Sequence, residues 1–312
     1  TPTNNEYYGN SVRIFKSYLA VGTQKDLNGS VYIYYKNQAT DVYSLQYTID
    51  IQTGRSGGSE EQDELYNKDS KFGAFLDITD KYLIVGAPEY SSQDPDNASI
   101  DTGRVYLYKR TGTTWSFLKK WDVVTDFSIT SAQAMFGHRP TITNDIMLIG
   151  SQEKGTGNAG SGKLYIFDKN TGGTDNWGHI KTLSYPGSNN SGVSNDLGEE
   201  FGKSNQIDGD YIIVGAPTGH AYDTAERANS GLAFIYYRHT GGRDTWGLQQ
   251  TIYAQLTNGD EDITVDDEFG TDVSISGRYC IVGAPKENSS RGAAYIYYRT
   301  GNVWTIQQKI VP

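Results

Sequence analysis

The sequence predicts an all-β fold, a β-propeller of five four-stranded antiparallel blades, and a long internal repeat carries this prediction. Five units open on an aromatic-glycine pair, and successive units start 64, 64, 65 and 68 residues apart. An aromatic or aliphatic residue follows ten positions after each opening aromatic residue, and a glycine follows after fourteen. Self-similarity at a fixed period is the signature of a repeat architecture. The opening pairs are Tyr8-Gly9, Phe72-Gly73, Phe136-Gly137, Phe201-Gly202 and Phe269-Gly270.

Each unit contains short runs rich in β-branched and aromatic residues, which are typical of strands. In the fourth unit the turn dipeptide Asp208-Gly209 separates the first two runs, and Pro217, which cannot donate to a strand ladder, ends the second. The expected strands of this unit are 203–207, 211–214, 232–237 and 246–252. Every unit repeats this order. Many short antiparallel strands at one period are typical of a propeller, in which radial repetition protects the sheet edges.

We expect a single domain over residues 1–312, because the repeat spans nearly the whole chain. The expected blades are 7–49, 72–121, 136–183, 201–252 and 269–312. An open β-solenoid is the alternative, but its shorter rungs fit the observed period poorly. The first unit starts at its first strand and the last ends at its fourth. We therefore expect no exchanged closing strand, and we expect blade five to meet blade one through side chains.

Three units carry a more specific pattern, in which Phe-Gly is followed fourteen residues later by Gly-Ala-Pro. The Gly-Ala-Pro triplets start at Gly86, Gly215 and Gly283. This pattern resembles the FG-GAP repeat proteins, whose best-known member is the integrin α-subunit propeller. The first and third units depart from it, with Gly22-Thr23-Gln24 and Gly150-Ser151-Gln152. The family's propellers usually have seven blades, whereas this sequence contains five units.

Integrin-like repeats often carry an Asp-rich calcium loop between strands one and two. Here that connection is a tight turn in every unit, and two residues cannot surround an ion that takes six to eight oxygen ligands. The resemblance therefore implies the secreted, short-turn branch of the family without the integrin calcium sites. The five turns are at Lys16-Ser17, Asp80-Lys81, Asn144-Asp145, Gly209-Asp210 and Gly277-Arg278.

The connections between strands two and three, and the linkers between blades, are expected on one face of the propeller. Both vary in length, which is typical of a binding surface on a rigid scaffold. Together they carry a net charge of −18, whereas the rest of the chain carries +8. A surface of one sign attracts divalent cations or a basic partner. The overall net charge of −10 argues against nucleic acid as a partner.

Two acidic segments are the candidate calcium ligands. The first precedes the fifth unit, and the second lies in the longest loop between strands two and three; neither matches the EF-hand template. The simpler interpretation is that these carboxylates keep the protein soluble. The candidate ligands are Asp260, Asp262, Asp266, Asp267 and Glu268 in the first segment, and Asp94, Asp96 and Asp101 in the second.

Other features favour structural roles or an extracellular setting. Cys280 occupies a position that is apolar in the other units, so a buried strand residue is favoured over a reactive thiol. The periodic tryptophans that start the fourth strands are expected to pack blade against blade, with sugar stacking as the alternative. They are Trp115, Trp177, Trp246 and Trp304. Glycosylation acceptors fall in the variable loops, at Asn28, Asn97, Asn189 and Asn288.

Motifs for catalysis and membrane insertion are missing from the sequence. The segment from Gly157 to Lys163 resembles the start of a phosphate-binding loop, but Leu164 follows where Ser or Thr is needed, and the segment joins two strands. No stretch approaches the ~18 apolar residues of a membrane span. The sequence therefore predicts a non-enzymatic, extracellular binding or adhesion module that recognises a protein or glycan through its acidic loop face, with calcium as a stabilising ion. The alternatives are a self-assembling structural subunit of an extracellular filament or virion surface, and a lectin-like glycan binder.

Overall fold

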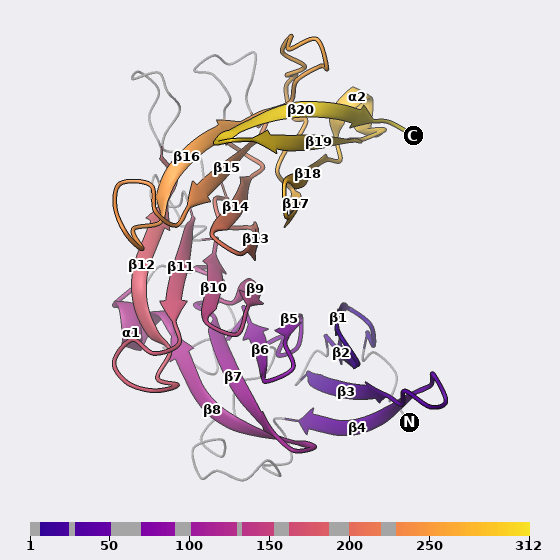
Figure 1. The fold of residues 1–312 in the computed structure, drawn as a ribbon, viewed down its shortest axis with the longest axis vertical. Helices are drawn as coiled ribbons and strands as arrows, with labels where there is room; N and C mark the ends of the chain where they lie inside the picture. The colour runs from indigo at the N-terminus through magenta and orange to yellow at the C-terminus, as the bar shows by residue number, and fades with distance from the viewer. Residues whose placement is uncertain are drawn as a thin grey trace. The chain divides into compact units, whose positions relative to one another are not determined.

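The computed structural model describes residues 7–24, 29–50, 70–90, 101–129, 133–152, 162–186, 200–219 and 229–312. These residues form five sheets, and each contains four strands that follow one another in the chain (Figure 1). The chain divides into two compact units, Thr1–Ile149 with Phe167–His179 and Gly150–Ile166 with Ile180–Pro312. In the part described, no helix is long and apolar enough to cross a membrane.

The sheets repeat one topology, in which each strand pairs with the next strand in the chain. The first sheet comprises β1 (Ser11–Phe15), β2 (Tyr18–Gly22), β3 (Ser30–Lys36) and β4 (Tyr43–Asp50). The second comprises β5 (Phe75–Ile78), β6 (Tyr82–Ala87), β7 (Arg104–Thr111) and β8 (Thr114–Asp122). The third comprises β9 (His138–Ile142), β10 (Ile146–Ser151), β11 (Lys163–Asp168) and β12 (Gly178–Ser184).

The last two sheets have the same order. The fourth comprises β13 (Ser204–Asp208), β14 (Tyr211–Ala216), β15 (Leu232–Tyr237) and β16 (Gly247–Ile252). The fifth comprises β17 (Asp272–Ser276), β18 (Tyr279–Ala284), β19 (Ala293–Thr300) and β20 (Val303–Ile310). These five four-stranded antiparallel sheets confirm the predicted fold class.

The repeat extends to details of register that the sequence did not predict. The third and fourth strands of four sheets shift register once, at the same place in each sheet, which marks a β-bulge. The shifts occur at Ile33/Tyr34, Leu107/Tyr108, Ile235/Tyr236 and Ile296/Tyr297. Two short helices, α1 (Val123–Phe127) and α2 (Glu287–Ser290), were also not predicted.

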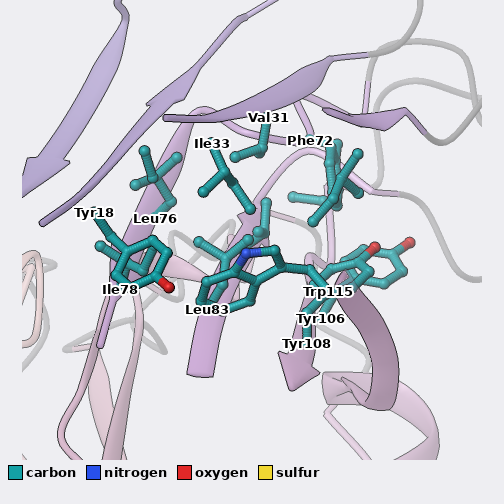
Figure 2. Packing of buried hydrophobic residues seen from close by; sticks show 14 residues of the cluster. Tyr18, Val31, Ile33, Phe72, Leu76, Ile78, Leu83, Tyr106, Tyr108 and Trp115 are labelled. Carbon is teal, nitrogen blue, oxygen red and sulfur yellow. The ribbon is translucent and has the colours of Figure 1, made fainter. Parts of the chain in front are cut away.

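The sheets of each unit pack face to face through apolar side chains. In the first compact unit, Val31 and Ile33 of the first sheet join a buried cluster with Leu76 and Leu83 of the second sheet (Figure 2). In the second unit Ile213 of the fourth sheet joins Val273, Ile275 and Cys280 of the fifth. Burying these side chains supplies the main favourable term in folding.

Three of the four periodic tryptophans, Trp115, Trp177 and Trp304, lie in these boundaries, as the packing interpretation predicted. The ring of Trp115 lies edge-on against Tyr18 of the preceding sheet, with centroids 5.9 Å apart, and Trp304 lies against Tyr211 at the same distance. All four tryptophans are buried. A sugar therefore cannot stack on them in this structure, and the packing interpretation is confirmed for Trp115, Trp177 and Trp304.

The two glycines of the repeat motif meet where one sheet packs on the next. A Cβ added to Gly22 would lie 2.1 Å from the carbonyl oxygen of Gly73, and one added to Gly215 would lie 2.0 Å from that of Gly270. Gly86 has the same relationship to the carbonyl oxygen of Gly137, at 2.1 Å. Only glycine allows the backbones to approach so closely. The aromatic-glycine corner and the later glycine are thus the two halves of a single contact between sheets.

Polar groups reinforce the same boundaries. Serine hydroxyls donate to the corner carbonyls, and side-chain oxygens accept from first-strand amides of the next sheet. The bonds are Ser11 Oγ to Gly73 O at 2.7 Å, Ser204 Oγ to Gly270 O at 2.7 Å, Ile142 N to Asp77 Oδ2 at 2.9 Å and Ile275 N to Gln206 Oε1 at 2.6 Å. These bonds satisfy backbone groups that the sheets themselves leave unpaired.

Candidate functional site

At two places the end of a linker lies against the end of a loop between strands two and three. In the first unit the amides of Met135 and Phe136, at the end of a linker, donate to carbonyls of Asp101 and Thr102, at the end of a loop between strands two and three. In the second compact unit, the amides of Glu268 and Phe269 donate in the same way to the carbonyls of Asn229 and Ser230. In each unit, these backbone bonds place linker and loop on one side of the sheet.

The acidic segment 253–268 connects β16 to β17 and folds into a compact turn. The amide of Leu256 donates to the carbonyl of Asp260 at 2.8 Å, and the amide of Asp262 donates to the carbonyl of Ala254 at 3.1 Å. At the tip, the Asn258 side chain donates to Asp260 Oδ2 at 2.6 Å. These local bonds hold the exposed carboxylate of Asp260 in place.

Asp262 and Glu287 converge on two residues of the fifth sheet. The buried phenol of Tyr295 lies 2.8 Å from Asp262 Oδ2 and 2.5 Å from Glu287 Oε2, so its single proton bonds one carboxylate at a time. Lys309 Nζ lies 2.5 Å from Asp262 Oδ2 and also pairs with Glu287. This network, which we call the Lys309 cluster, ties the acidic segment and α2 to β19 and β20.

Burial and charge set the protonation of the Lys309 cluster. Burial, together with hydrogen bonds to Glu287 and Asp262, raises the pKa of the Tyr295 phenol far above its usual value, so the phenol stays a donor. For Lys309, burial lowers the pKa, but the hydrogen bonds to Asp262 and Glu287 outweigh it, and the net shift is upward. The ammonium therefore stays charged and neutralises one of the two carboxylates.

Asp267 forms a separate buried contact. Its Oδ2 accepts from the amide of Thr264 at 2.7 Å, and its Oδ1 accepts from the Thr264 hydroxyl at 2.5 Å. Burial raises the pKa of Asp267, the Thr264 bonds lower it, and the negative charges of Glu287 and Asp262 raise it further. The arrangement is that of a side chain closing its own loop.

The remaining two acidic candidates face the neighbouring loops. Glu268 pairs with Lys286 at 2.7 Å, and Asp266 Oδ1 accepts from Asn229 Nδ2 at 2.9 Å. The hydrogen bond to Glu268 raises the pKa of Lys286. Asp266 is exposed, so it remains open to solvent on the other side of this contact.

In the structure, each carboxylate of the first predicted group of calcium ligands therefore has its own protein partner, which donates a hydrogen bond or forms an ion pair with it. Among the residues described, no three His, Cys, Asp or Glu side chains are grouped to hold a metal ion. In the second group, Asp94 and Asp96 lie outside the described residues, and burial raises the pKa of Asp101. Calcium binding stays a prediction.

Sequence analysis missed the partners of these carboxylates. It identified none of Tyr295, Glu287 and Lys309 as a partner of the acidic segment. Lys309 lies forty-seven residues after Asp262 in the chain. One signal in the sequence could have found Lys309. It lies near the end of the last predicted strand, in a repeat that is preceded by an acidic segment, and a lysine on a packed strand needs a negatively charged partner.

The predicted glycosylation acceptors are mostly beyond the described residues. Asn28, Asn97 and Asn189 lie outside them. Asn288 is exposed in α2, with a left-handed backbone conformation at φ 51°. An exposed asparagine is accessible to a transferase, and glycosylation stays a prediction.

Comparison with known proteins supports the repeat. Residues 246–297 match the family model of the FG-GAP repeat. No curated protein sequence matches the chain. Among solved structures, the chain is similar to "Kluyveromyces lactis Hsv2 complete loop 6CD", with 8% sequence identity and a TM-score of 0.50; the match covers 98% of this chain and 63% of that chain. The chain therefore spans less than two thirds of that neighbour, and at this identity the likeness shows the fold alone.

Proposed function

Since residues 246–297 match the FG-GAP repeat and all five sheets share one topology, we propose that the chain is a non-catalytic extracellular module of the FG-GAP type that binds a protein or glycan partner through its acidic loop face. The observation that carries the proposal is the fixed acidic turn at 253–268. Asp260 and Asp266 are exposed on it, next to the exposed side chains of Leu256 and Val265. Charged and apolar groups held together on an ordered loop are suited to recognition.

The chemistry of this surface favours a basic partner. Lys309 and Lys286 are already paired with carboxylates of the segment, so the exposed acidic residues add negative charge that these lysines do not offset. A protein ligand with Lys or Arg residues would be attracted over the distance of a Debye length, about 8 Å at physiological salt. Binding should therefore weaken as salt increases.

The experiment is a screen of immobilised proteins and glycans, followed by affinity measurements on two variants of equal charge change. Asp260→Asn with Asp266→Asn removes two charges from the acidic turn. The control, Asp41→Asn with Asp145→Asn, removes two exposed charges from the turns between strands. We expect the first variant to bind the ligand about tenfold more weakly at low salt and the control to bind normally. Equal affinity of the two variants would contradict the proposal.

Calcium remains part of the proposal as a stabiliser of the loops. The described carboxylates already have protein donors, so Asp94 and Asp96, outside the described residues, are the candidates to test first. A calorimetric titration of chelator-treated protein should show heat and a rise in melting temperature that Asp94→Asn with Asp96→Asn removes. No heat and an unchanged melting temperature would exclude a stabilising calcium ion.

The alternative function, a structural subunit of an extracellular assembly, is favoured by a different observation. Within its own compact unit, the first sheet leaves the apolar side chains of Val12 and Ile14 uncovered, and the fifth sheet leaves those of Tyr279 and Ile281 uncovered. Apolar sheet faces of this kind are normally covered. The lectin-like alternative draws no support from the buried tryptophans.

A further inference from the structure

Lys309 meets two carboxylates at a point where three segments of the second compact unit converge. It lies in β20, directly opposite Tyr295 of β19 in the strand ladder (Figure 1). Asp262 comes from the acidic segment 253–268, and Glu287 comes from α2. The amine nitrogen of Lys309 lies 2.5 Å from Asp262 Oδ2 and also pairs with Glu287 Oε1. An amine and a carboxyl group, the two halves of an amide, are therefore in direct contact.

The groups are held in this contact by the fold. The amide of Asp262 donates to the carbonyl of Ala254 at 3.1 Å, which fixes the backbone of the segment. The buried ring of Tyr295 packs edge-on against Phe269, with centroids 5.4 Å apart, and the Lys309 nitrogen lies 5.5 Å from the centroid of the Tyr295 ring. Reactants held in contact in this way avoid much of the free energy that a bimolecular reaction needs to bring them together.

Glu287 and Tyr295 connect the two reacting groups by a path for protons. Glu287 is only 4% exposed, and its Oε1 contacts the amine of Lys309. Its other oxygen lies 2.5 Å from the phenol of Tyr295. The phenol in turn lies 2.8 Å from Asp262 Oδ2, and it can accept one proton while it donates another. A proton that leaves the amine can therefore reach the carboxyl oxygen without passing through solvent.

An ion pair alone does not account for Glu287. One lysine offsets one carboxylate, so the Lys309 cluster carries two negative charges against one positive charge. Burying the second carboxylate costs desolvation energy and adds repulsion from Asp262. A second, buried carboxylate beside an amine is what a reaction requires when a proton must be carried from one group to another.

We propose that Lys309 and Asp262 condense into an intramolecular amide that cross-links the acidic segment to β20, with two neighbouring side chains as proton carriers. A proton first moves from the amine to Asp262 Oδ2, which leaves a neutral amine and a carboxylic acid. The amine nitrogen then attacks Cγ of Asp262 and forms the carbon–nitrogen bond, while Glu287 Oε1 takes the proton that the nitrogen releases. Tyr295 donates its proton to Oδ2 and takes the one held by Glu287. The bond between Cγ and Oδ2 breaks, one water leaves, and no other reactant is required.

The charge of Lys309 makes this reaction slow. Burial lowers the pKa of Lys309, but the hydrogen bonds to Asp262 and Glu287 outweigh it, so the ammonium predominates and the reactive neutral amine is rare. Condensation should therefore take place slowly, after the chain has folded. The product is favoured because an uncharged amide replaces a partly buried ion pair. The link fixes the acidic turn to the sheet whatever partner the turn binds, so it does not depend on the proposed function.

The first test compares intact masses of the unglycosylated full chain by mass spectrometry. Wild-type protein should be about 18 Da lighter than its sequence requires, because one water is lost. Lys309→Arg keeps the positive charge but cannot form the amide, and it should show no deficit. Lys286→Arg, at a lysine that pairs with Glu268, is the matched control and should keep the deficit. A wild-type chain without the deficit overturns the proposal.

Digestion with trypsin locates the link. Trypsin does not cut after an acylated lysine, so residues 244–278 should be recovered joined to residues 300–312. A link that joins 300–312 to 287–291, the fragment that contains Glu287, would contradict the proposed acceptor.

A further test separates reaction from structure. Glu287→Gln keeps the size of the side chain but cannot take the proton, so the linked fraction should fall at least about tenfold. Tyr295→Phe removes the relay, and it replaces Glu287→Gln if melting temperatures show that the latter is not folded. A linked fraction equal to that of the wild type in a folded variant would overturn the role of the proton carriers. Ligand binding by Lys309→Arg reports on the acidic turn separately, because this variant keeps the charge without the link.

Discussion

The carbonyl oxygen of Gly73 lies so close to Gly22 that a Cβ on Gly22 would be 2.1 Å from it. The same relationship joins Gly270 to Gly215. The contact explains the glycine that stands fourteen residues after the opening aromatic residue in the first, second and fourth repeats. It is set by the approach of two backbones, rather than by the conformation of the strand that carries the glycine.

The first prediction concerns this contact. Gly215→Ala should lower the free energy of unfolding by about 3 kcal/mol or more, because its Cβ would overlap a backbone carbonyl that cannot move without displacing a whole sheet. Urea unfolding of Gly215→Ala and of the wild type measures the difference. Equal stability of the two would show that the close approach is not required.

The second prediction concerns the Lys309 cluster. Lys309→Met should lower the free energy of unfolding by about 3 kcal/mol at neutral pH, because Asp262 and the buried Glu287 lose the cation between them. Thermal unfolding at neutral pH measures the loss.

Its control is Lys36→Met, which removes a lysine that pairs with the exposed Asp41. An exposed pair contributes little, so this variant should lose less than about 1 kcal/mol. A loss in Lys309→Met no greater than in the control would contradict a charge-balancing role for Lys309.

The third prediction is a pH dependence of stability from Asp77. Burial raises the pKa of Asp77 to about 6, against the lowering effects of the Ile142 amide, the Arg13 charge and the Ile78 amide. The unfolded chain has the usual value near 3.9, so between about pH 4 and pH 6 the native state holds a proton that the unfolded state releases. Stability should therefore fall as the pH rises through this window.

Asp77→Asn removes the ionisable group. The decrease in the free energy of unfolding between about pH 4 and pH 6 should therefore be about 2 kcal/mol smaller in this variant than in the wild type. Asp145→Asn, at an exposed carboxylate in the turn before β10, is the control and should keep the wild-type slope. Denaturant unfolding between about pH 4 and pH 7 provides the measurement. Parallel slopes in the wild type and Asp77→Asn would contradict the assignment.

The fourth prediction concerns Cys280. The thiol is buried, and burial raises its pKa to about 12, so almost no thiolate exists at neutral pH. A chromogenic thiol reagent should react with native protein no faster than the protein unfolds, and should react fully in denaturant. Rapid modification of the native protein would restore the reactive-thiol alternative.

The fold was predictable because its signals are local. Strand runs, the turn at Asp208-Gly209 and the break at Pro217 lie within a few residues of one another, and the observed β15 matches the expected range 232–237. Trp246 was expected to begin a strand but precedes it with a left-handed φ of 48°, because the preceding turn determines its backbone. The site was less predictable. The carboxylates of 260–268 are close in sequence, but their donors come from residues far along the chain, such as Asn229 and Lys309.

The glycine contact has a consequence for how such chains change in length. Each unit of the repeat carries both halves, a corner for the preceding sheet and a bare backbone for the following one. Duplicating or deleting one whole unit in a gene would bring together two halves that already match, whereas losing part of a unit would leave a half without its mate. The architecture therefore permits evolution by whole modules, with surface loops free to diverge in each copy.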